Sequence, residues 1–168
     1  MTDNARIDPT AIALWRRFND RLTTSAQPTE DQLGLIAGLG VAHLINLGLH
    51  SHEKALPNEA YTVAGHGMDY IHIPVLFDAP TEADYAHFRD VMRDLGDRTN
   101  HSAVHVHCIA NFRVSAFLYR YRRDELGLPE AMVRQEMESI WRPGGVWACL
   151  IGDEAGVPLP HRIAGRDY

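Results

Sequence analysis

The chain has 168 residues, of which 45% are hydrophobic and 23% are charged. This composition is typical of one globular domain with a sizeable core, and it argues against a disordered chain. The 22 acidic residues outnumber the 16 basic residues and give a net charge of −6, which argues against nucleic acid or an anionic membrane as the main partner, because either would require a basic surface.

The first ten residues, MTDNARIDPT, contain no apolar stretch after a basic one, and no run approaches the roughly 20 apolar residues of a membrane span. The two cysteines, Cys108 and Cys149, are too few for a disulfide framework. We therefore expect a reduced, cytoplasmic protein without a signal peptide, in which residues 1–8 are loose.

The hydrophobic pattern predicts strands that alternate with helices. In chain order, the expected elements are a short helix over 12–18, a strand over 22–24, a helix from 29 to 38, a strand over 43–49, a helix opening at 57, a strand over 70–75, a helix opening at 81, a strand over 103–107, and helices over 113–125 and 129–140. A turn is expected at 142–145, and the Gly- and Pro-rich residues 152–168 are expected to be irregular.

Alternation of this kind predicts βαβ units and a single α/β domain over residues 1–168. Its centre is expected to be a mostly parallel sheet of four to five strands, flanked by helices. In such sheets the ligand site lies where the strands deliver their carboxyl ends into loops. This rule singles out the loops 76–80 and 108–112.

The second of these loops carries the most informative segment, HVHCIANFRVS over 105–115. A strand is expected to end at His107, so that the backbone N–H groups of Ile109, Ala110, Asn111 and Phe112 lie in a tight loop and a first helical turn, where they can point at an anion. The same N–H groups and the helix dipole favour the thiolate form of Cys108, which makes it a candidate nucleophile. Arg113 can hold a tetrahedral oxyanion with two parallel hydrogen bonds.

This segment resembles the active-site loop of the protein tyrosine and dual-specificity phosphatase superfamily. The closer similarity is to a bacterial branch, the beta-lactamase-hydrolase-like phosphatase-like domain, in which four residues separate Cys and Arg, as they separate Cys108 and Arg113. Further matching segments run in order over about residues 20–140: Thr24-Ser-Ala-Gln-Pro-Thr29, Leu44-Ile-Asn-Leu47, Tyr70-Ile-His-Ile-Pro-Val75 and Ala79-Pro-Thr81.

The resemblance implies a phosphatase-like fold and hydrolysis of a phosphate monoester through a cysteinyl-phosphate on Cys108, without a cofactor. Arg113 and the loop N–H groups would stabilise the phosphoryl oxygens, and a carboxylic acid would protonate the leaving alcohol. Asp78 is the expected acid, because its position thirty residues before the cysteine matches the order and spacing of the superfamily. The substrate would be a small anionic compound or a phosphoprotein; its identity and the oligomeric state are open.

Three positions depart from the branch. Asn111 stands where Gly is usual, although Asn tolerates left-handed dihedral angles better than other non-glycine residues. Val114 replaces the hydroxyl residue that follows Arg, and Ser115 comes one position later, about 100° further round the helix. Gly48 stands where the branch often carries Arg. These departures predict a site that is weaker than that of an efficient phosphatase.

Two other functions are compatible with the loop. Rhodanese-type sulfurtransferases also have Cys and Arg separated by four residues, and a loop of this type can bind a phosphate or a phosphoprotein without turnover. His107 and Ser115 are the expected supporting residues; His107 would help to order the loop if its ring donates to a backbone carbonyl. The i, i+2 pairs His50/His52 and His105/His107 are the only hint of metal ligands, and no third ligand stands at a diagnostic spacing. Cys149 is expected to be a small buried side chain rather than a redox partner of Cys108.

Overall fold

The computed structural model describes residues 6–97 and 102–168, so most of the segment 1–8 expected to be loose lies outside the described residues. A sheet of five strands forms the centre of the domain, in the order β1-β2-β5-β3-β4, and its last four strands are mutually parallel. The strands are Arg16–Asn19 (β1), Leu22–Ser25 (β2), Val41–Asn46 (β3), Asp69–His72 (β4) and Ala103–His107 (β5). The expected α/β domain with a mostly parallel sheet is confirmed.

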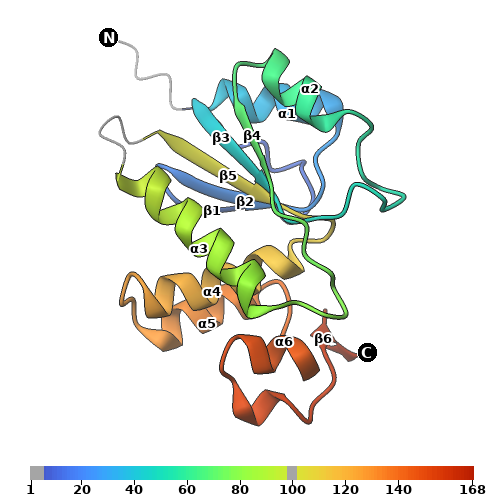
Figure 1. Cartoon of the computed structure of the whole chain (residues 1–168), viewed down its shortest axis with the longest axis vertical. Coiled ribbons are helices and arrows are strands. Elements are labelled where there is room, and N and C mark those ends of the chain that lie inside the picture. The colour runs from blue at the N-terminus through green and yellow to red at the C-terminus, as the bar shows by residue number, and fades with distance from the viewer. Residues whose placement is uncertain (1–5, 98–101) are drawn as a thin grey trace.

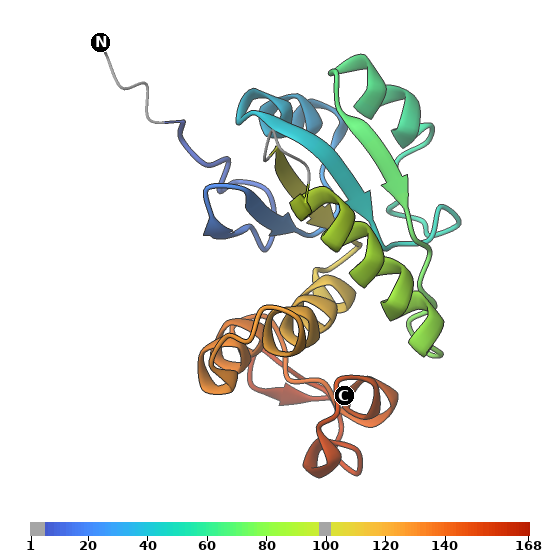
Figure 2. The ribbon, with the colours of Figure 1, turned by 60° about the vertical axis from the view of Figure 1, so that its left-hand side comes forward.

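Helices cover both faces of this sheet (Figures 1 and 2). Their bounds are Glu30–Gly38 (α1), Glu59–Gly65 (α2), Glu82–Asp97 (α3), Phe112–Asp124 (α4), Glu130–Glu138 (α5) and Gly145–Leu150 (α6). α1 and α2 lie over one face, while α3 and α4 lie over the other, with α5 and α6 stacked outside α4 (Figure 1). Each face buries its own apolar cluster, so the sheet is the middle of three layers.

Local capping chemistry begins two helices as expected. Thr29 and Gln32 form a capping box at the start of α1, in which each side chain accepts a hydrogen bond from the other residue's backbone N–H. Thr81 and Asp84 exchange the same pair of bonds before α3. These bonds satisfy N–H groups that have no partner within the helix.

The predicted helix over 12–18 is wrong, because β1 occupies Arg16–Asn19 and pairs with β2 in the antiparallel direction. Leu14 adopts the left-handed conformation, with φ 54°, which no residue of a right-handed helix has. A seven-residue helix is too short to be stable by itself. Pairing with β2 therefore decides the structure of this segment.

Short elements occur in the C-terminal region that was expected to be irregular. They are a 3₁₀ turn over Glu154–Gly156 and a two-stranded ribbon made of Arg162–Ile163 (β6) and Arg166–Asp167 (β7). α6, which the sequence pattern did not predict, precedes them and exposes Cys149. The expectation of a buried Cys149 is wrong, because α6 is short and turns this side chain to its outer face. Among the described residues, no helix is both long enough and apolar enough to cross a membrane.

Candidate active site

The four parallel strands end in one row of polar residues. Ser25 of β2 lies beside His107 of β5, His107 beside Asn46 of β3, and Asn46 beside His72 of β4. The loops that follow these residues therefore leave the sheet at a common edge, where a site is expected in a sheet of this type. Because side chains alternate along a strand, His107 faces the α1 and α2 layer, and Cys108 belongs to the apolar cluster of the α3 and α4 layer.

Three carbonyl groups of the loop between β5 and α4 have hydrogen-bond partners within the protein. Cys108 O lies 3.2 Å from His107 Nδ1, Ile109 O accepts from the backbone N–H of Gln27 at 3.2 Å, and Asn111 O accepts from Ser115 at 3.0 Å. Within residues 6–97 and 102–168, no acceptor is found for the backbone N–H groups of 109–113. This arrangement can hold an oxyanion by peptide N–H groups at the start of a helix.

Arg113 connects this loop with the loop that follows β4. Its Nε donates to Val75 O at 2.8 Å, and its guanidinium carbon lies 5.3 Å from the centre of the Phe77 ring. The two loops singled out by the sequence therefore meet at this arginine, which is 8% exposed. Its remaining N–H groups are the ones that could hold an anion in two-point fashion.

Cys108 has no solvent-exposed surface in this structure. It packs within the larger apolar cluster, together with residues of β5, α3 and α4. A phosphate group can therefore reach the sulfur only when the side chains that cover it move. Movement of this kind is common in enzymes that close their site over a substrate.

Asn111 takes the left-handed conformation that the sequence predicts, with φ 62° and ψ 6°. Its side chain is fully buried and points away from the loop: Nδ2 donates to Leu14 O at 2.9 Å and to Thr24 Oγ1 at 3.1 Å. Asn111 thereby ties the loop to β2 and to the turn before β1. These two hydrogen bonds help to hold Asn111 in a conformation that glycine would adopt without steric cost.

Replacing Asn111 by alanine should lower the free energy of unfolding by about 2–4 kcal/mol, because two buried hydrogen bonds are lost and alanine is strained at a positive φ. Asn111→Gly loses the same bonds without the strain and should be about 1 kcal/mol more stable than Asn111→Ala. Urea unfolding of the three proteins measures the difference. Equal stabilities of the alanine and glycine variants would contradict a strained loop.

The two supporting residues differ in what they contact. His107 faces the Cys108 carbonyl, as expected, and its other ring nitrogen lies 3.1 Å from the carboxylate of Glu59. Ser115 donates its hydroxyl proton to Phe112 O at 3.0 Å and accepts from Trp141 Nε1 at 2.9 Å. The one proton of Ser115 is thus donated within α4.

Asp78 is exposed at the centre of a turn closed by Leu76 O and Ala79 N, 3.3 Å apart. The preceding residue, Phe77, anchors this turn: its carbonyl accepts from Trp147 Nε1 at 2.7 Å, and its ring packs against Trp147 and His161. Burial lowers the pKa of His161, and the charge of Asp78 partly offsets that shift. Asp78 thus lies one residue beyond the ring that contacts Arg113.

Glu59 is the functional candidate that the sequence reasoning missed. An acidic residue in the first turn of a helix, just after Pro57 and Asn58, is an ordinary helix-start pattern, and nothing in the sequence indicates that it is buried. In the structure it is 3% exposed and receives hydrogen bonds from Gln27 Nε2 and Asn46 Nδ2. Asn46 in turn accepts from the Gly48 N–H, and a Cβ at Gly48 would lie 3.4 Å from Ile109 Cδ1.

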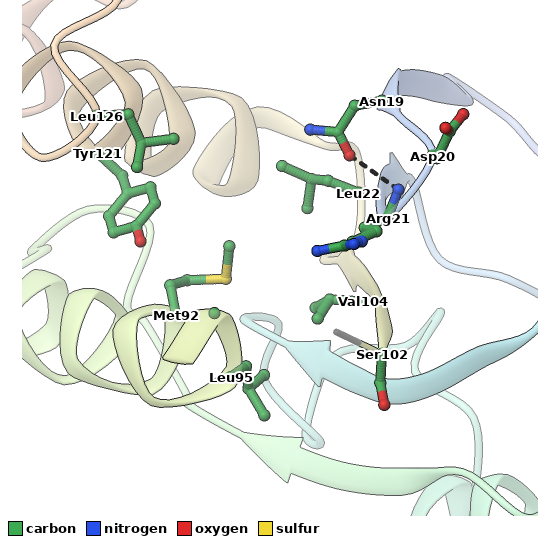
Figure 3. Close-up of a pocket in the computed structure, with 11 residues that line it drawn as sticks. Asn19, Asp20, Arg21, Leu22, Met92, Leu95, Ser102, Val104, Tyr121 and Leu126 are labelled. Atoms are coloured by element: carbon green, nitrogen blue, oxygen red, sulfur yellow. Dashed lines mark hydrogen bonds between the residues drawn. The ribbon is translucent and has the colours of Figure 1, made fainter. Parts of the chain in front are cut away.

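A cavity of about 560 Å³ lies at the opposite, amino end of the parallel strands (Figure 3). Its apolar wall comes from β2, α3, β5 and α4, and includes Leu22, Met92, Leu95, Val104 and Tyr121. It contains none of the predicted site residues. Among the described residues, no group of three histidine, cysteine or acidic side chains is placed to hold a metal ion.

Known proteins similar to this chain include hydrolase-like proteins by sequence and phosphatase-like proteins by structure. The chain is 31% identical over 131 residues to the beta-lactamase hydrolase-like proteins of two strains of Xylella fastidiosa; the match covers 76% of this chain but only 28% of those relatives. A DUF442 phosphatase-like protein from Shewanella putrefaciens CN-32 superposes with a TM-score of 0.73 at 30% identity, over 84% of this chain and 91% of that one. No family model matches the chain.

More distant structures share the fold. A cysteine-to-serine form of TpbA from P. aeruginosa, in complex with phosphotyrosine, gives a TM-score of 0.60 at 20% identity, over 90% of this chain and 82% of TpbA. With 91% of the DUF442 structure covered at 30% identity, the chain belongs to the DUF442 family of phosphatase-like proteins.

Proposed function

We propose that this protein is a cysteine-dependent phosphatase that hydrolyses phosphate monoesters through a cysteinyl-phosphate. The observation that carries the proposal is the loop from Cys108 to Arg113. The carbonyl groups of Cys108, Ile109 and Asn111 have other hydrogen-bond partners, the loop N–H groups have no acceptor among the described residues, and a guanidinium stands at the end of the loop. Such a loop suits the three oxygens of a phosphoryl group.

The reaction proceeds in two displacements at phosphorus. The Cys108 thiolate attacks, the P–O bond to the alcohol breaks, and Asp78 gives its proton to the leaving oxygen. Water then attacks the cysteinyl-phosphate, passes a proton to the Asp78 carboxylate, and the P–S bond breaks to return the thiolate. In both steps Arg113 and the N–H groups of 109–113 stabilise the negative charge on the equatorial oxygens.

Arg113 can bind phosphate without giving up its contact with the loop that follows β4. Its Nε bond to Val75 O leaves the other side of the guanidinium to bind phosphate, and the Phe77 ring beside it lies on the loop that carries Asp78. Movement of this loop would bring the acid toward the substrate, while access to Cys108, which is buried in the structure, requires movement of the side chains packed over it. Binding and proton donation are thereby coupled through one short segment.

An aryl phosphate is the substrate of choice for a first test, since TpbA, which shares the fold, is known in complex with phosphotyrosine. The purified chain is offered an aryl phosphate and, separately, thiosulfate with cyanide. Release of phosphate without formation of thiocyanate supports the phosphatase. Thiocyanate formation without phosphate release would indicate sulfur transfer, and phosphate binding without turnover would indicate a binding module.

Replacing Asp78 by asparagine should affect poor leaving groups much more than good ones, because only a poor leaving group needs a proton in the transition state. We expect kcat for an alkyl phosphate to fall by about 10²–10³-fold, and kcat for a nitrophenyl phosphate by less than about tenfold. Steady-state kinetics on both substrates measures the ratio.

Asp90→Asn is the matched control, because Asp90 is an exposed carboxylate of α3 that pairs with the neighbouring Arg89. Its kinetics should equal those of the wild type on both substrates. Equal losses on the two substrates for Asp78→Asn would remove Asp78 from the role of the acid.

A further inference from the structure

Glu59 is a carboxylate buried directly behind the cysteine loop. Gln27 Nε2 donates to its Oε1 at 2.6 Å, Asn46 Nδ2 donates to its Oε2 at 3.1 Å, and His107 Nε2 lies 3.1 Å from the same Oε2. Burial raises the pKa of Glu59, but the hydrogen bond and charge of His107 and the amide of Gln27 together outweigh it and lower the pKa below its ordinary value. Glu59 is therefore ionised at neutral pH.

His107 lies between two groups that can only accept hydrogen bonds. Nε2 faces the Glu59 carboxylate at 3.1 Å, and Nδ1 faces the carbonyl of Cys108 at 3.2 Å. A neutral imidazole carries only one N–H. Its other ring nitrogen would then be an acceptor that faces another acceptor, either the carboxylate or the carbonyl, without a proton between them. Both contacts are satisfied when both ring nitrogens are protonated, so the geometry favours the imidazolium form.

A cation in this place acts on the residue that follows it. The His107 ring is buried, with no exposed surface, so water would not screen a positive charge on it. A neighbouring positive charge favours the thiolate over the thiol. The bond from Nδ1 also holds the Cys108 carbonyl away from the centre of the loop, where it would repel an anion.

We propose that Glu59 is a positioning residue for the cysteine loop: its buried carboxylate keeps His107 doubly protonated, and this imidazolium turns the Cys108 carbonyl outward and favours the Cys108 thiolate. The use of that thiolate rests on the proposed function. The effect of the Glu59 charge on His107 does not rest on the proposed function, because it is a property of the resting protein.

The other titratable groups around the pair are neutral. His105, 6.4 Å from His107 between ring centres, bonds to Thr23 and Ser25, and burial followed by the charge of His107 holds its pKa well below the ordinary value. The pKa of His72 is also lowered, mainly by burial. In the Tyr70 phenol, burial and the Glu59 charge raise the pKa. None of these groups supplies a second full charge to His107 at neutral pH.

Stability alone does not account for the pair. A buried ion pair commonly contributes no more to folding than neutral groups of the same shape, because both charges lose their hydration. A neutral isostere at position 59 should therefore leave the fold intact while removing the charge. Glu59→Gln is such an isostere: Oε1 of Gln27 is buried without a partner, so this amide can turn round and accept a hydrogen bond from the new side chain, in exchange for the bond from its Nε2 to Pro28 O.

The test is the rate at which iodoacetamide alkylates Cys108, followed by mass spectrometry at two pH values, with the exposed Cys149 as internal reference. Glu59→Gln should slow alkylation of Cys108 about tenfold near pH 6 and leave it unchanged near pH 9, where a thiol ionises without help. Alkylation of Cys149 should be unchanged at both. Tyr70→Phe is the matched control, because it removes a hydroxyl of the same network but no charge, and its rates should stay within about twofold of the wild type.

Two results would overturn the inference. Glu59→Gln that reacts like the wild type near pH 6 would show that the carboxylate does not act on the thiol, and a slowing of equal size at both pH values would show a structural effect on access. If Glu59→Gln fails to fold, a measurement on the wild-type protein tests the same proposal. Nitrogen-15 NMR of the His107 ring should show two protonated nitrogens at neutral pH. A neutral His107 ring would refute the proposal that Glu59 keeps it doubly protonated.

Neither readout needs turnover. A protein that hydrolyses no phosphate ester but shows the pH-dependent effect of Glu59→Gln would refute the proposed function and leave this inference standing. A protein with cysteine-dependent turnover and a pH-independent effect would do the reverse.

Discussion

Replacing Cys108 by serine should lower kcat/KM for an aryl phosphate by about 10³-fold or more, equivalent to at least about 4 kcal/mol of transition-state stabilisation. A serine hydroxyl remains protonated in a setting that favours a thiolate, so the nucleophile is lost while the shape of the side chain is nearly kept. The loop N–H groups and Arg113 are unchanged by this substitution. The variant should therefore still bind inorganic phosphate, which titration calorimetry can measure.

Cys149→Ser is the matched control, since Cys149 is exposed on α6 and far along the chain from the loop. Its kinetics should equal those of the wild type. Phosphate release that survives in Cys108→Ser would eliminate the cysteinyl-phosphate mechanism, whatever the fold.

Replacing Arg113 by alanine should lower kcat/KM by about 10³-fold. The kcat/KM of Arg113→Lys should be less than about tenfold higher than that of Arg113→Ala. Lysine keeps the charge, but it cannot offer two parallel N–H groups to a phosphoryl group. It also cannot keep the Nε bond to Val75 O while binding an anion on its other side. Steady-state kinetics on the aryl phosphate measures both variants.

Arg120→Lys is the control on the same helix, because the partly exposed Arg120 pairs with Glu82 and donates to Leu150 O, and neither contact involves the cysteine loop. Its kcat/KM should stay within about twofold of the wild type. Full activity in Arg113→Lys would show that charge alone is needed at this position and would argue against two-point binding of the phosphoryl group.

Much of the fold follows from local chemistry and could be predicted without coordinates. The capping pairs at Thr29 and Thr81 begin α1 and α3 because they act over three residues. The strands β3 and β5 follow from short apolar runs between turn residues. The left-handed Asn111 could likewise be anticipated, because that conformation is a preference of the residue itself.

The sequence-based predictions are wrong or incomplete where contacts with residues distant in the sequence decide the structure. Residues 16–19 form β1 because β2 offers them a free edge, and no periodicity within seven residues reveals an edge. Cys149 is exposed because α6 turns it outward, and an apolar run does not show which face of a helix is covered. The burial of Glu59 needs α2 to be placed over the ends of β3 and β5.

The sequence by itself therefore determined the family, the alternating α/β pattern and the loop from Cys108 to Arg113, because each depends on residues that are neighbours along the chain. Only the tertiary structure decided that this loop meets Val75 and Phe77 through Arg113, that the sulfur is sealed, and that a buried carboxylate from α2 stands behind His107. Burial and charge pairing are properties of side chains brought together from separate segments, and the polar ends of four parallel strands are what brings them together here.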